Sequence, residues 1–266
     1  MHRPVARPLQ ASATSSPSLV LRRMTWPIAA FVAAAVLLAW YVTWTTSDLA
    51  MGVLMAPAMA APSELFVAFL LLVVMMVAMM LPSALPMVLT YRDLSRLDHG
   101  EPTRPADGIG TTVFASAYFV VWGAFSLAAF VAFSALGLLG PLTGLLAILP
   151  AAVLVGAGAW QVTRAKEVCL THCQSPLGFV MQHWRGGRRG AWRMGMHHAL
   201  YCIGCCWLFM LVLFVSGAMS LVWMAGISVA IFVEKVGWRP LLVSRAIGVV
   251  FAAAGGLVLV QALLTL

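Results

Sequence analysis

Charged residues are scarce in this sequence. Only 9% of its 266 residues are Asp, Glu, Lys or Arg, whereas 62% are hydrophobic. A soluble domain carries about 25% charged residues, because its surface must be covered with groups that water solvates. The scarcity therefore excludes a soluble globular protein and indicates an integral membrane protein that is helical for most of its length.

Sequence signatures of catalysis are also missing. The chain has no phosphate-binding loop, no dinucleotide fingerprint, and no set of Ser, His and Asp or of paired carboxylates that would indicate hydrolysis. Its basic residues do not interleave with aromatics as on nucleic-acid-binding faces, so membrane topology explains the net charge of +8 better. We therefore expect a binding role rather than an enzymatic one, and no nucleic-acid partner.

Apolar segments that could cross a bilayer recur along the chain, given that each spanning helix needs about 20 apolar residues. They cover residues 27–45, 65–91, 112–138, 142–163, 195–216, 219–236 and 241–266. We expect a disordered basic cytoplasmic tail at 1–26, a loop at 46–64 and the longest internal loop at 164–194. The predicted fold is an all-α bundle of seven transmembrane helices, which forms a single domain over 27–266.

The distribution of Lys and Arg supports this count. When the N-terminus is placed in the cytoplasm, all 16 Lys and Arg fall on the cytoplasmic side of the seven spans. Positive charge favours cytoplasmic loops, so we expect the N-terminus inside and the C-terminus outside. The lipid bilayer of a bacterial inner membrane is then the first expected partner.

Three of the five cysteines lie close together in the fifth apolar segment. Cys202, Cys205 and Cys206 are spaced i, i+3 and i+4, so a helix would place them on one face, with His198 one turn earlier. The 164–194 segment, on the same predicted side of the membrane, holds the remaining cysteines and another histidine: Cys169, His172 and Cys173.

This combination of ligands predicts a metal site. Thiolate and thioether ligands favour Cu(I), and mixed Cys and His ligands also suit zinc. The cytoplasm keeps thiols reduced, so structural disulfides are not expected. Two alternatives remain open. The cysteines could be small apolar fillers in a non-catalytic assembly protein, or Cys202 and Cys205 could form a redox-active Cys-x-x-Cys pair.

Methionines and one acid add further candidates. The second apolar segment holds Met75, Met76, Met79 and Met80, and the 46–64 loop holds Met51, Met55 and Met59. Thioethers at this spacing can bind Cu(I), although a methionine stripe in an apolar helix also serves packing. Glu234 is costly inside a membrane and is therefore a candidate site residue. Alternatively, it pairs with Lys235 or Arg239 at the interface.

Four motifs resemble a bacterial family of predicted metal-binding integral membrane proteins of unknown function, some of which are labelled copper chaperones. They are AMMLPSALP at 78–86, CLTHCQSP at 169–176, HALYCIGCCWLFM at 198–210 and the Glu234-Lys235 pair. The resemblance implies metal binding, with Cys169, Cys173, Cys202, Cys205 and Cys206 as candidate ligands.

The residues and the resemblance together predict a membrane protein that holds a soft metal for transport, storage or delivery. Copper is favoured and zinc is the alternative, and a copper-accepting protein is an expected partner. The candidate ligands are Cys169, His172, Cys173, His198, Cys202, Cys205, Cys206, Glu234, Met75, Met79 and Met80.

Overall fold

The computed structural model describes residues 17–55, 60–98, 101–102, 107–135, 147–215 and 220–265. Two strands of two residues each, β1 (Leu97–Asp98) and β2 (Glu101–Pro102), pair in an antiparallel hairpin. The other regular structure of these residues is helical. The helices are α1 (Pro17–Met55), α2 (Pro62–Leu94), α3 (Gly108–Ala135), α4 (Leu149–Trp160), α5 (Arg164–Gln174), α6 (Pro176–His183), α7 (Gly187–Val215), α8 (Leu221–Val236) and α9 (Pro240–Thr265). The expectation of an all-α fold is confirmed.

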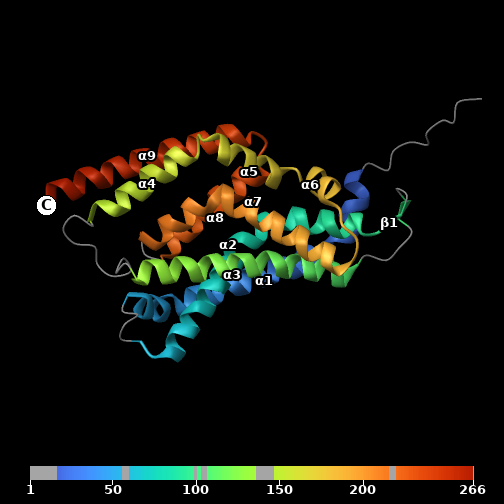
Figure 1. Cartoon of the computed structure of the whole chain (residues 1–266), viewed down its shortest axis with the longest axis horizontal. Coiled ribbons are helices and arrows are strands. Elements are labelled where there is room, and N and C mark those ends of the chain that lie inside the picture. The colour runs from blue at the N-terminus through green and yellow to red at the C-terminus, as the bar shows by residue number, and fades with distance from the viewer. Residues whose placement is uncertain are drawn as a thin grey trace, which may run out of the picture.

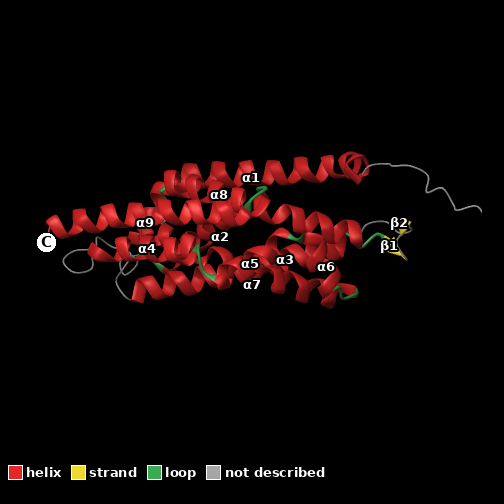
Figure 2. Ribbon diagram, turned by 90° about the horizontal axis from the view of Figure 1, so that it is seen from above, coloured by secondary structure: helices red, strands yellow, loops and turns green. Residues whose placement is uncertain are grey.

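The long helices share one axis and form an elongated bundle, with the C-terminus at one end and the β1–β2 hairpin at the other (Figures 1 and 2). In Figure 1, α4 and α9 run side by side along one side of the bundle, and α1 to α3 lie along the other, with α7 and α8 between them. The most extensive packing joins α3 to α7. Gly195 permits it, because a Cβ at this position would overlap the carbonyl oxygen of Phe114.

Among the residues that the structure describes, five helices are long and apolar enough to cross a membrane: Ala30–Val53 within α1, α2, α3, α7 and Pro240–Leu264 within α9. The remaining two predicted spans correspond to shorter helices, α4 with 12 residues and α8 with 16. Each of the seven predicted segments thus overlaps a helix, and a crossing by all seven stays a prediction.

Several predicted boundaries differ from the observed helices. Residues 46–55, expected in a loop, continue α1, so Met51 lies on a helix, and Met59 falls outside the described residues. The predicted tail also lies outside them up to residue 16, and from Pro17 the backbone is already helical. Polar residues near the ends of α1 lowered the local hydropathy, but hydropathy does not mark where a helix ends.

The expectation of a long loop at 164–194 is wrong, because this segment folds into α5, α6 and the first turns of α7. Thr163 caps α5, accepting a hydrogen bond of 3.2 Å from the Lys166 backbone N–H. The buried positions of α5 are Lys166, Leu170 and Cys173, spaced i, i+4 and i+7. A short amphipathic helix of this kind has too little apolar length to register as a membrane span.

Candidate metal centre

Three thiols on α7 form a compact group. The Sγ atoms of Cys202, Cys205 and Cys206 all lie within 4.8 Å of one another, and each side chain is at most 1% exposed. The thiols of Cys205 and Cys206 contact the Cys202 carbonyl oxygen at 3.1 and 2.8 Å. No other such group of three or more His, Cys, Asp or Glu ligands occurs among the described residues. We call these three side chains the thiol cluster.

The two cysteines of α5 lie against the same part of α7. Interaction with the neighbouring thiols of Cys202 and Cys205, together with burial, raises the pKa of the Cys173 thiol well above its ordinary value. Burial and the nearby Cys205 also raise the pKa of Cys169. The Sγ atom of Cys169 sits over Gly204, where a Cβ would meet it at 2.6 Å. Both α5 side chains are therefore held as neutral thiols at the edge of the cluster.

A buried lysine faces the thiol cluster from α8. The Nζ atom of Lys235 lies 2.8 Å from Cys202 Sγ and 3.4 Å from Ser83 Oγ. The hydroxyl of Tyr118 on α3 lies 3.1 Å from the same sulfur. An ammonium group in an apolar core is costly unless an opposite charge compensates it. The sulfur of Cys202 is the contacting group that can carry such a charge.

A second buried lysine belongs to an ion pair beside the cluster. The Nζ atom of Lys166 lies 2.7 Å from Glu234 Oε2, and both side chains are at most 2% exposed. Lys166 also donates a hydrogen bond of 2.6 Å to the Cys205 carbonyl oxygen. Glu234 is therefore paired, but with Lys166 from α5 instead of the predicted Lys235 or Arg239. The ion pair ties α5 and α8 to α7.

The two histidines predicted as ligands lie near the thiol cluster but outside it. His198 is 3% exposed and stacks on Tyr118, with ring centroids 5.4 Å apart. Neither of its ring nitrogens has a hydrogen-bond partner among the described residues. His172 stacks on Tyr201 at 4.2 Å, and its Nδ1 atom lies 2.8 Å from the Val168 carbonyl oxygen. Metal ligation by either histidine stays a prediction.

The methionines of α2 lie in the same hydrophobic core as the thiol cluster. Met75, Met79 and Met80 are at most 1% exposed and pack there with Met76. This placement is what packing requires. Their role as ligands stays a prediction.

The sequence does not reveal the roles of Lys166 and Tyr118, and it suggests Glu234 instead of Cys202 as the partner of Lys235. The chain has only two lysines against fourteen arginines, and both lysines are buried beside cysteines. In the sequence both lysines lie near the predicted ends of spans, where membrane topology also explains a positive charge. The adjacency of Lys235 to the acid Glu234 was a usable signal, because buried charges occur in compensated groups.

The model of a protein family, PpoB2, described as a copper chaperone, matches residues 69–258. The chain belongs to this family. The matched range contains all five cysteines and both lysines of this chain, together with the methionines of α2. The resemblance seen in the four sequence motifs is thereby confirmed. No curated protein and no solved structure matches the chain significantly.

The Lys166–Glu234 pair makes a prediction about stability. Glu234→Gln removes the charge that compensates a buried ammonium, so it should lower the free energy of unfolding by about 3–5 kcal/mol. Denaturant unfolding of the detergent-solubilised protein measures this loss.

The control is the double variant Lys166→Met/Glu234→Leu, which replaces the pair with apolar groups of similar size. It should unfold close to the wild type, because such replacement of a buried ion pair is often neutral. A Glu234→Gln variant as stable as the wild type would contradict the assignment of a charged pair.

Proposed function

We propose that the protein holds Cu(I) as cargo at Cys202, Cys205 and Cys206 and delivers it to a copper-accepting protein. One observation carries this proposal: three buried cysteine sulfurs lie close together in a member of a copper chaperone family. Sulfur ligands select Cu(I) over harder cations. The family match and the chemistry of the donors therefore favour the same metal.

The number of ligands in the thiol cluster favours Cu(I) over zinc. Zinc in structural sites takes four ligands, and the cluster supplies three. Lys166 and Glu234 compensate each other, whereas Lys235 contributes one positive charge at Cys202 Sγ. Cu(I) held by two thiolates and one neutral thiol of the cluster would have a net charge of −1, which Lys235 would balance. A nearly neutral site is the one that an apolar core accommodates at least cost.

We further propose that the protein resides in a bacterial inner membrane with seven spans, the N-terminus inside and the C-terminus outside. Five helices have the length and composition of spans, and the other two predicted spans overlap α4 and α8. This topology would place all 16 Lys and Arg at the cytoplasmic side. Copper would then be held in the cytoplasmic half of the membrane.

The proposal predicts the metal content of purified protein. Protein loaded with Cu(I) under reducing conditions should retain near-stoichiometric copper, and Cys202→Ser/Cys205→Ser/Cys206→Ser should lose it, because hydroxyls are poor ligands for a soft metal. Elemental analysis counts copper and zinc together. Cys169→Ser is the matched thiol control and should keep most copper, because Cys169 lies outside the group of three.

Three results would contradict the copper proposal. These are a wild type that takes up no Cu(I), a wild type that prefers zinc, and a triple variant that binds as well as the wild type. Oxidation of Cys202 and Cys205 to a disulfide during turnover, detected by thiol titration, would instead favour the redox alternative.

The contact between Lys235 and Cys202 makes a separate prediction about affinity. Lys235→Met should weaken Cu(I) binding by about tenfold or more, which corresponds to at least about 1.4 kcal/mol of lost charge compensation. Lys235→Arg keeps the charge and should bind more tightly than Lys235→Met. Competition with a chromophoric Cu(I) chelator measures both affinities. Equal affinities for Lys235→Met and the wild type would show that the ammonium does not balance the thiolates.

A further inference from the structure

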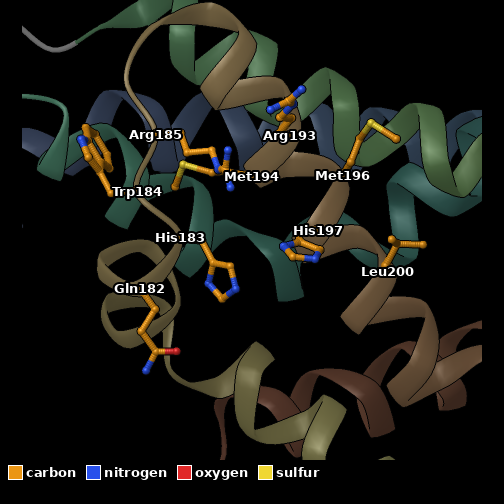
Figure 3. Close-up of a pocket in the computed structure, with 9 residues that line it drawn as sticks. All are labelled: Gln182, His183, Trp184, Arg185, Arg193, Met194, Met196, His197 and Leu200. Atoms are coloured by element: carbon orange, nitrogen blue, oxygen red, sulfur yellow. The ribbon is translucent and has the colours of Figure 1, made fainter.

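A pocket of about 520 Å³ opens at the junction of α6 and α7, apart from the thiol cluster. Its walls come from the end of α6, the linker at 184–186 and the first turns of α7 (Figure 3). This volume lies within the range of about 300–1,000 Å³ that is typical of small-ligand sites. The copper proposal gives the pocket no role.

The polar lining of the pocket is basic. Arg185 and Arg193 line it together with His183 and His197, and no acidic residue is among its lining residues. Figure 3 shows the imidazoles of His183 and His197 side by side in the pocket, and their ring centroids lie 5.1 Å apart. In the part of the chain that the structure describes, no carboxylate forms an ion pair with either arginine. The pocket therefore favours an anion over a metal cation.

Local backbone contacts position Arg185 beside the first turns of α7. Gly187 has a φ of +74°, a conformation that glycine adopts without strain, and it turns the chain into α7. Gly190 then allows the linker to fold back, because a Cβ there would overlap the carbonyl group of Arg185. On the other side of the linker, Trp184 packs against Tyr91, with ring centroids 5.7 Å apart. The position of Arg185 thus follows from specific local contacts.

Apart from Gln182, the rest of the lining is apolar, and exposed apolar side chains also occur on the neighbouring helix α6. Met196 and Leu200 of α7 line the pocket and are 38% and 56% exposed. Leu177 and Met181 of α6 are 55% and 66% exposed. Exposed apolar side chains next to the basic groups of the pocket would suit a ligand with an anionic headgroup and alkyl chains. A phospholipid has this chemistry, and guanidinium groups pair well with phosphate.

We propose that this pocket binds the headgroup of one anionic phospholipid, with the phosphate at Arg185 and Arg193 and the alkyl chains along Met196 and Leu200. The proposal depends on the membrane placement proposed above and is independent of the copper site. A lipid held there would fix the α6–α7 junction at the membrane surface. Binding at this pocket differs from the general attraction of basic residues to anionic lipid, because it requires Arg185 and Arg193 in particular.

The chain offers a matched control for this requirement. Arg188 and Arg189 lie between the two pocket arginines and are exposed, but they do not line the pocket. The double variants Arg185→Ala/Arg193→Ala and Arg188→Ala/Arg189→Ala therefore remove the same charge from the same segment. Native mass spectrometry of delipidated protein titrated with phosphatidylglycerol or phosphatidylcholine measures binding by each variant.

We expect the wild type and Arg188→Ala/Arg189→Ala to bind one phosphatidylglycerol in preference to phosphatidylcholine. Arg185→Ala/Arg193→Ala should bind it about tenfold or more weakly, as expected from the loss of at least one charge-assisted hydrogen bond. Equal losses in the two double variants, or no preference for phosphatidylglycerol, would overturn the proposal. Displacement of the lipid by an equal concentration of inorganic phosphate would also overturn it, because the apolar wall would then contribute nothing.

Copper content measured on the same samples separates this proposal from the copper site. Arg185→Ala/Arg193→Ala should keep its copper, and Cys202→Ser/Cys205→Ser/Cys206→Ser should keep its lipid. A loss of copper together with lipid in the arginine variant would show that the two sites are not independent, which would contradict the proposal.

Discussion

The ammonium group of Lys235 lies in an apolar core, 2.8 Å from the sulfur of Cys202. This contact and the Lys166–Glu234 ion pair satisfy the requirement that buried charges be compensated. Together they join α5, α7 and α8 around the thiol cluster, and Ser83 extends the contact to α2. Because each compensating partner comes from a different helix, the charges can be satisfied only when the helices pack in this arrangement.

The same requirement connects the fold to its proposed function. A group of thiols able to hold Cu(I) carries negative charge once the metal binds, and the apolar core of the bundle offers no water to solvate that charge. The protein supplies a lysine in place of water. The thiols of α5, with Cys169 packed against Gly204 and Cys173 beside Cys202 and Cys205, provide further sulfur at the edge of the cluster. Additional sulfur beside a site would help a metal exchange ligands during transfer to a partner.

The sequence was sufficient to predict the helical class, the presence of each main helix and the shared face of Cys202, Cys205 and Cys206, because these depend on local composition and helical period. It was not sufficient for α5 and α6. They are short, and the few apolar positions of α5 form a recognisable buried face only when α7 packs beside that helix. The ion pair between Lys166 and Glu234 joins residues far apart in the chain, so no local pattern contains it. Tyr118 was missed for the same reason, because its hydroxyl reaches Cys202 from another helix.

X-ray absorption spectroscopy at the copper edge, performed on the detergent-purified protein loaded with Cu(I), tests the central claim most directly. The account predicts a first coordination shell made of sulfur alone, since the closest ligands in the cluster are the thiols of Cys202, Cys205 and Cys206. A shell dominated by nitrogen or oxygen would contradict it and would place the metal at the histidines or at Glu234.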